Sequence, residues 1–143
     1  RLVTAYAALL KKEPPLVVID FGTAVTMDFV NSKGEYEGGL IFPGIRLALG
    51  SLVDNTALLP SVVLKEAQGF IGRDTKSSMT NGILFGYAAM CDGLVARFKE
   101  KYGRKIHVVA TGGDADMIAK YSRFVDEVRP NLIFDGLSDM ISR

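Results

Sequence analysis

The chain has 143 residues, enough for one domain with a sizeable core, and its 48% hydrophobic and 23% charged residues are ordinary for a folded soluble protein. A net charge of +1 without a Lys/Arg cluster gives no electrostatic footprint for nucleic acid, and no apolar run approaches the ~18 residues that cross a bilayer. One cysteine excludes an internal disulfide, and one histidine disfavours a histidine-based metal site. Without a signal peptide, the expected compartment is the cytoplasm.

The first half of the chain predicts one helix followed by three closely spaced strands. Residues 2–12 read as a helix, which Pro14 and Pro15 end because proline cannot continue one. The strands are expected at residues 16–19, 24–30 and 36–42. The first is continuously apolar, which is typical of a strand buried on both faces, and the short turns between the three predict antiparallel pairing.

The second half alternates helices with strands. Helices are expected at residues 45–58, at 75–102, from 114 onward and at 132–141, with strands at 106–110 and 124–128. In the long helix, apolar residues that step by three or four predict one buried face; they are Ile83, Tyr87, Met90, Leu94 and Phe98. This order predicts an α/β fold, a ribonuclease-H-like mixed sheet with helices on its faces, as a single domain over residues 1–143.

Asp20 ends the apolar strand and is followed by a tight turn. A carboxylate in the middle of a buried strand is costly unless it is paired, whereas at the strand end it can face a ligand, a cation or water. Gly22 permits the tight turn, and Thr23 adds a hydroxyl and a backbone N–H. A turn of this kind at a strand end could bind a phosphate, with a cation between the phosphate and Asp20. The alternative is that Asp20 only caps the turn.

Two glycine pairs lie in or beside later strands. Gly38 and Gly39 fall within the third strand, where glycine marks either a β-bulge or the close approach of a ligand or another backbone. Gly112 and Gly113 follow a strand and precede a helix, which leaves backbone N–H groups open to a nucleotide. The chain contains no Rossmann or Walker A motif.

Five segments, in this order and at this spacing, resemble the type III pantothenate kinases. They are DFGTAVTMDFV, GEYEGGLIFPG, DNTALLP, GRDTKSSMTNG and ATGGDA. The resemblance covers essentially the whole chain. That family belongs to the superfamily of acetate and sugar kinases, heat-shock chaperones and actin, whose members have two ribonuclease-H-like domains with the active site between them. The resemblance therefore implies that this chain, which begins with Arg1, is the C-terminal domain of a longer kinase.

The resemblance also implies a role for each matching residue. Asp20 resembles the ligand of a monovalent cation, K⁺ or NH₄⁺. The ATP-binding turns of the family are matched by Gly22, Thr23, Gly112 and Gly113. Contacts to pantothenate are matched by Arg1, Gly39 and Thr75. The family's catalytic base is the Asp that precedes the Arg of a G-x-D-R motif, so no catalytic residue is assigned within this sequence.

The activity that the resemblance implies is ATP-dependent phosphorylation of pantothenate, the first step of coenzyme A biosynthesis, with Mg²⁺ and a monovalent cation. Because the base and the first phosphate loop fall outside the sequence, the isolated chain is expected to be inactive. The resemblance and the long apolar side of the helix at 75–102 imply a homodimer with that helix in its contact. The charge and hydropathy of the chain lead us to expect neither a nucleic-acid nor a membrane partner. The alternatives are another kinase of the same superfamily and a non-catalytic regulatory relative of the Bvg accessory factor type.

Five residues have roles that the residues alone leave open. Thr75 is expected to be the N-cap of the long helix, a pantothenate contact or both. Asp28 either reaches the cation or forms a structural pair, and Arg46 faces ligand or solvent. Cys91 is expected to be an inert packing residue and His107 a core or edge residue with no catalytic part.

Overall fold

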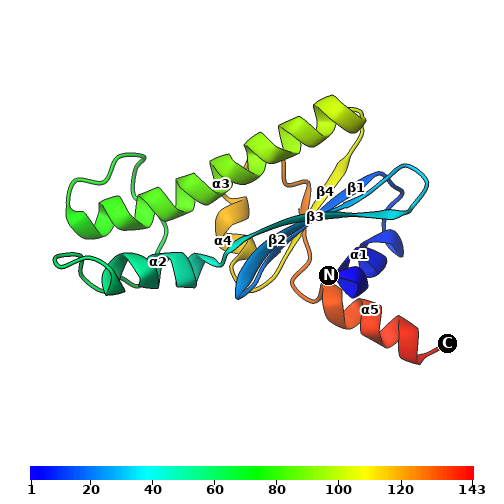
Figure 1. Ribbon diagram of the computed structural model, residues 1–143, viewed down its shortest axis with the longest axis horizontal. Helices are drawn as coiled ribbons and strands as arrows, with labels where there is room; N and C mark the ends of the chain where they lie inside the picture. The colour runs from blue at the N-terminus through cyan, green and yellow to red at the C-terminus, as the bar shows by residue number, and fades with distance from the viewer.

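The structure, a computed structural model, describes residues 1–143 and contains one five-stranded mixed sheet (Figure 1). The strands are β1 (Leu16–Phe21), β2 (Ala24–Val30), β3 (Tyr36–Pro43), β4 (His107–Thr111) and β5 (Glu127–Val128). They lie in the order β3-β2-β1-β4-β5. Short turns make β1, β2 and β3 antiparallel, and helical crossovers make β4 parallel to β1 and β5 parallel to β4. This is the ribonuclease-H-like sheet that the element order predicts.

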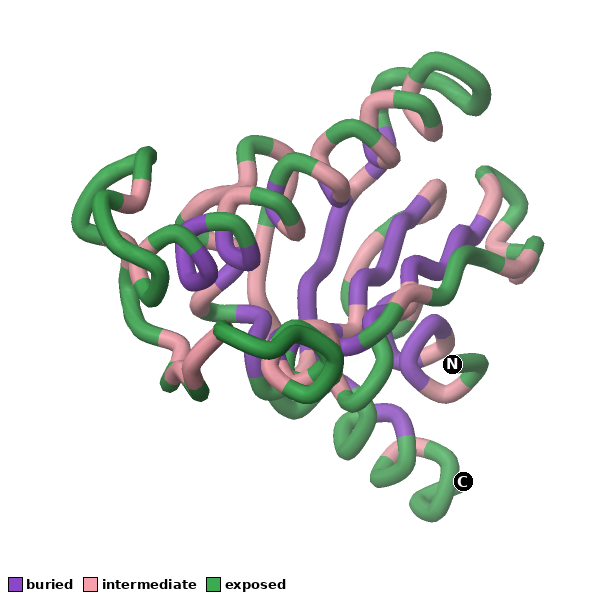
Figure 2. Tube along the Cα trace, turned by 60° about the vertical axis from the view of Figure 1, so that its left-hand side comes forward, coloured by how far each residue is buried: buried purple, intermediate pink, exposed green.

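Helices cover both faces of the sheet. One face carries α2 (Ile45–Asp54), α3 (Thr75–Tyr102) and α4 (Ala115–Ala119); the other carries α1 (Leu2–Leu9) and α5 (Leu132–Ile141). Alternation along β1 divides the core accordingly, because Val17 and Ile19 point to the first face and Leu16 and Val18 to the second. Buried residues therefore concentrate in the strands, as Figure 2 shows.

Three elements are shorter than the sequence predicts. α1 ends at Leu9 and not at residue 12. α2 ends at Asp54 and not at residue 58, because Thr56 Oγ1 donates to the Leu52 carbonyl and Asn55 Nδ2 to the Ser51 carbonyl, which satisfies carbonyls of the last turn. β5 contains only Glu127 and Val128. The backbone N–H groups of residues 124 and 125 donate instead to the side chains of residues 92 and 122, so they are not available to the sheet.

The long helix α3 buries a face slightly rotated from the predicted one. Its most deeply buried residues include Leu84, Ala88, Cys91 and Val95, and the predicted residues from Tyr87 to Phe98 lie half-buried around them. Burial raises the pKa of the Cys91 thiol to about 12, which makes it a packing residue and not a nucleophile. None of the helices is both long enough and apolar enough to span a bilayer.

Candidate functional site

Three turns meet at the end of the sheet where β1 and β4 finish; we call this the three-turn site. They are the turns at residues 20–23, 43–46 and 111–114. The contacts between them are close: a Cβ at Gly44 would lie 2.0 Å from the Thr23 carbonyl oxygen, and the Asp114 N–H donates to the Phe21 carbonyl at 3.3 Å. Because β1 and β4 are parallel neighbours, their carboxyl ends bring these loops together.

Asp20 lies at the centre of the three-turn site and makes no hydrogen bond within the protein, although its side chain is half-buried. Burial raises the pKa of Asp20, and the nearby charge of Asp28 raises it further. A carboxylate that loses water without gaining a donor is costly in its charged form. The interpretation of Asp20 as a turn cap therefore lacks its hydrogen bond, and a cation would satisfy the charge.

Of the two glycines that follow β4, only Gly112 occupies a position where the backbone geometry requires glycine. Gly112 has a φ of +94°, and a Cβ there would lie 2.6 Å from Asp20 Oδ1 and 2.6 Å from the Phe21 carbonyl oxygen. At Gly113 a Cβ would meet open space. Gly112 thus allows the β4 turn to pass directly against Asp20, whereas Gly113 is exposed to solvent.

Backbone donors are left free around Asp20. Among the turn residues, the N–H groups of Thr23, Gly112 and Gly113 donate to no acceptor within the protein, whereas the Gly22 N–H donates to the Ala24 carbonyl at 3.2 Å. Thr23 is also exposed. Free N–H groups of this kind bind anions, and phosphate oxygens in particular. The arrangement therefore offers donors to a phosphate and one carboxylate to a cation.

Arg46 does not face solvent alone, because it pairs with a residue of the third turn. Its Nη2 donates to Asp114 Oδ1 at 3.2 Å; the Asp114 side chain is buried and that of Arg46 is exposed. The pair ties the start of α2 to the start of α4 and so holds two of the three turns together. A hollow of about 420 Å³ opens beside Arg46, between α2 and residues 61–64, with Met117 of α4 in its wall.

Asp28 forms the structural pair that was one of its two expected roles. It is 2% exposed and accepts from Arg1 through Nε at 2.9 Å and Nη2 at 2.6 Å. Tyr36 OH donates to the same Oδ1 at 2.8 Å, and Thr26 Oγ1 to Oδ2 at 3.3 Å. The hydrogen bond from Arg1 to Asp28 raises the pKa of Arg1, whereas burial and the hydrogen bond from its own hydroxyl to Asp28 raise the pKa of Tyr36.

Gly39 lies against this Asp28 cluster. A Cβ at Gly39 would lie 2.1 Å from the Met27 carbonyl oxygen and 2.7 Å from Asp28 Oδ1. The close approach that a strand glycine indicates is therefore, at this position, the approach of the neighbouring strand β2. Gly38 is the other glycine of the pair and has a φ of +110°. It lies beside the irregular register between Phe29 and Val30, which accounts for a glycine at this position.

Thr75 lies outside the three-turn site. It is the first residue of α3, at the end of that helix most distant from the sheet (Figure 1). The expectation that Thr75 caps the helix is wrong: the N-cap is Asp74, whose side chain accepts from the Ser77 N–H at 2.9 Å. That bond lowers the pKa of Asp74. Thr75 is exposed and borders a shallow hollow of about 530 Å³.

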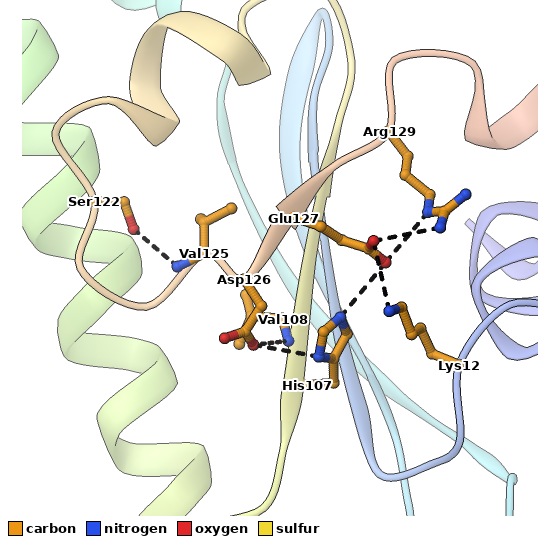
Figure 3. A network of polar contacts seen from close by, with 8 residues as sticks. All are labelled: Lys12, His107, Val108, Ser122, Val125, Asp126, Glu127 and Arg129. Atoms are coloured by element: carbon orange, nitrogen blue, oxygen red, sulfur yellow. Dashed lines mark hydrogen bonds and ion pairs between the residues drawn. The ribbon is translucent and has the colours of Figure 1, made fainter.

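His107 lies at the opposite end of the sheet in a network of charged groups (Figure 3). Its Nδ1 is 3.6 Å from Asp126 Oδ2 and its Nε2 is 3.5 Å from Glu127 Oε1. Glu127 also pairs with Arg129 at 3.2 Å and Lys12 at 3.7 Å. Burial acts to raise the pKa of Glu127, but the hydrogen bond and charge of Arg129, with Lys12 and His107, hold it below its usual range.

No group of three or more His, Cys, Asp or Glu side chains lies close enough together to hold a metal ion. The three-turn site has a single unpaired carboxylate, an oxygen ligand that suits a hard cation better than a transition metal. Sequence reasoning did not assign Asp114 to the site, although it directly follows the glycine pair at residues 112 and 113. Nor did it find the partners of Asp28, which are 27 and 8 residues away.

The fold and the three-turn site define a class of protein: a ribonuclease-H-like domain whose sheet ends in glycine turns with free N–H donors. A solved structure from Campylobacter jejuni, named for the Baf family of transcriptional activators, has the same fold with a TM-score of 0.63 and 24% identity, over 98% of this chain and 63% of that one. The family model described as type III pantothenate kinase matches residues 1–97. The chain belongs to the type III pantothenate kinase family.

Curated relatives agree with this assignment. A type III pantothenate kinase of Rhizorhabdus wittichii is 43% identical over all of this chain, and one of Desulfosudis oleivorans is 44% identical over 96% of it. The alignments cover 56% and 54% of those two relatives. This chain therefore spans about half the length of the curated relatives it matches.

Proposed function

We propose that this chain is the C-terminal half of a two-domain kinase that transfers the γ-phosphoryl group of ATP to pantothenate. The observation that carries the proposal is the three-turn site, where the turns that carry the free N–H donors of Thr23, Gly112 and Gly113 meet at the unpaired carboxylate of Asp20. Family membership supports the substrate, because the curated relatives are named for pantothenate.

Phosphoryl transfer needs positioning and charge stabilisation more than covalent chemistry. The turn N–H groups would bind phosphate oxygens of Mg·ATP, and because their direction is fixed by the sheet, they need no rearrangement during transfer. Asp20 cannot contact a phosphate favourably, so it would hold a monovalent cation, K⁺ or NH₄⁺. Such a cation, when bound, offsets negative charge on the phosphates. Arg1 would bind the acceptor, and the base would come from outside this chain.

We propose that the kinase is a cytoplasmic homodimer with α3 in its contact. α3 is about 42 Å long at 1.5 Å per residue, more than the sheet covers, and its first turns extend away from the sheet (Figure 1). Because Thr75 is the first residue of α3, a contact between Thr75 and pantothenate would place the acceptor beside the start of that helix. Sedimentation of the intact protein tests the dimer, and a monomer at tens of micromolar would contradict it.

The proposed activity is tested by assaying pantothenate phosphorylation and ATP turnover by the intact protein and by the 143-residue chain. The intact protein should turn over ATP only when pantothenate is present. The chain alone should fold and be inactive, because loss of a general base alone costs roughly 10²–10⁴-fold. ATP turnover that ignores pantothenate would favour another kinase of the superfamily. No turnover at all would favour a regulatory relative, and activity of the chain alone would refute the division of the site between two domains.

A further inference from the structure

Asp28 is one of few charged side chains buried in this domain, and the three-turn site does not explain it. It lies on β2 at 2% exposure, on the same sheet face as Asp20. Burial of a carboxylate is tolerated only when donors replace its water. Asp28 has four such donor groups, on Arg1, Thr26 and Tyr36, so hydrogen bonds replace its water at both carboxylate oxygens.

The pairing with Arg1 uses only one edge of the guanidinium. Nε and Nη2 both donate to Asp28 Oδ1, whereas Nη1 has no partner within the protein, and 36% of the Arg1 side chain is exposed. An arginine has five N–H donors in a rigid planar fork. Fixing one edge therefore fixes the direction of the other, and the free edge points its donors at whatever occupies the exposed side.

The cluster is also connected to the three-turn site. Thr26 is the register partner of Asp20 on the neighbouring strand, and its hydroxyl donates to Asp28 Oδ2 at 3.3 Å. Gly39 leaves the space that Asp28 Oδ1 occupies, since a Cβ there would lie 2.7 Å from that oxygen. Arg1 is thus held by the same pair of strands that carries the turn at residues 20–23, and the two cannot move independently.

We propose that Asp28, assisted by Tyr36, is a positioning residue that holds Arg1 so that its free Nη1 edge binds an oxygen of the acceptor substrate in register with the phosphate-binding turn. The proposal rests on the proposed function, because that function supplies the acceptor. Asp28 itself does not touch the substrate. Its effect on the reaction passes through Arg1, and its loss should appear in the affinity for the acceptor and not in the affinity for ATP.

The kinetic test uses the intact protein with Asp28→Asn, which keeps the size of the side chain and an acceptor for Tyr36 OH. We expect KM for pantothenate to rise about tenfold, the loss of one charge-assisted interaction, with KM for ATP within about twofold of wild type. Tyr36→Phe should give a smaller shift in the same direction, and it keeps the test decisive if Asp28→Asn does not fold. The matched control is Asp92→Asn, since Asp92 also accepts three hydrogen bonds, but from the loop at residues 122–124.

A double-mutant comparison separates positioning from a general structural role. If Asp28 acts through Arg1, then Asp28→Asn should add little in an Arg1→Lys background, because lysine cannot keep the fork. Additive effects, equal changes in both KM values, or an unchanged KM for pantothenate would each overturn the proposal.

A measurement on the 143-residue chain is independent of the reaction. The Arg1 Nε–H signal in an NMR spectrum should exchange slowly with water in wild type and rapidly in Asp28→Asn, with the Asp92→Asn chain behaving as wild type. Rapid exchange in wild type would overturn the positioning of Arg1 whatever the substrate is. If instead Arg1 is protected but the intact protein does not phosphorylate pantothenate, the proposed function is wrong while the Asp28–Arg1 arrangement stands.

Discussion

The two ends of β4 lie beside half-buried acidic side chains in contrasting surroundings. At the end where β4 finishes, Asp20 has no hydrogen-bond partner, and burial raises its pKa. At the end where β4 begins, Glu127 has Arg129, Lys12 and His107 around it, and the net effect lowers its pKa (Figure 3). Both acids lie on the same sheet, so the difference comes from what the chain places around them.

We propose that the contrast separates a charge that stabilises the fold from a charge that binds a ligand. An acid whose pKa is lowered in the folded state contributes to stability at neutral pH, whereas one whose pKa is raised reduces it. A chain under selection for stability alone has no use for the second kind. Asp20 is therefore best explained by something that binds to it, and Glu127 needs nothing beyond its neighbours.

The sharpest test of this contrast is Asp20→Asn in the intact protein. Removing the charge should lower the phosphorylation rate on the order of 10²-fold, as for loss of one preorganised electrostatic contact, and should weaken the dependence of the rate on K⁺. Stability should not fall. The folded-state pKa of Asp20 is raised, so its charge costs stability as pH rises above about 3.9, and asparagine removes that cost. Wild-type activity with an unchanged response to K⁺ would reduce Asp20 to a turn residue.

The second test compares the two glycines beside Asp20. Gly112→Ala should destabilise the 143-residue chain by about 1–3 kcal/mol, because the residue has a positive φ and a Cβ there would clash with Asp20 and the Phe21 backbone. Gly113→Ala is the matched control, since its Cβ meets open space and should change stability by less than about 0.5 kcal/mol. Urea unfolding of both variants measures the difference. Equal effects would show that the β4 turn does not pass against Asp20 as described.

The sequence is sufficient for the parts of the molecule that local patterns determine. The sheet follows from apolar strands joined by short turns, and the order of residues alone places Asp20 at a strand end beside a glycine. The start of α3 shows the limit of such patterns. Asp74 and Thr75 are both good capping residues, and only the backbone geometry selects Asp74.

What could not be predicted depends on pairs that are distant in the chain. Arg46 meets Asp114 across 68 residues and Arg1 meets Asp28 across 27, and no spacing rule connects them. The short length of β5 also depends on side chains elsewhere in the structure. The backbone N–H groups of residues 124 and 125, just before β5, donate to Asp92 of α3 and to Ser122 and not to the sheet. Side-chain acceptors that arrive from another element override a strand preference that is only local.

The smallest expected effect, and the complement to Asp20→Asn, is Glu127→Gln. Because the folded-state pKa of Glu127 is lowered, its charge contributes stability above the unfolded pKa of about 4.3, and that contribution is lost as pH falls through the folded-state value. At pH 7 the variant should be less stable than wild type by up to about 1 kcal/mol, since the side chain is still 22% exposed and its ion pairs are partly screened. The difference should shrink as pH falls below about 4. Glu66→Gln, which removes an exposed pair with Lys120, is the control and should change stability little at either pH.

Thermal unfolding of the three chains across this pH range, with kinase assays of the intact variants, gives the decisive pattern. The Asp20 variant should lose activity without losing stability, and the Glu127 variant should lose stability without losing activity. If Glu127→Gln is as stable as wild type at pH 7, the charges at the beginning of β4 do not stabilise the fold, and the contrast between the two ends of the sheet fails.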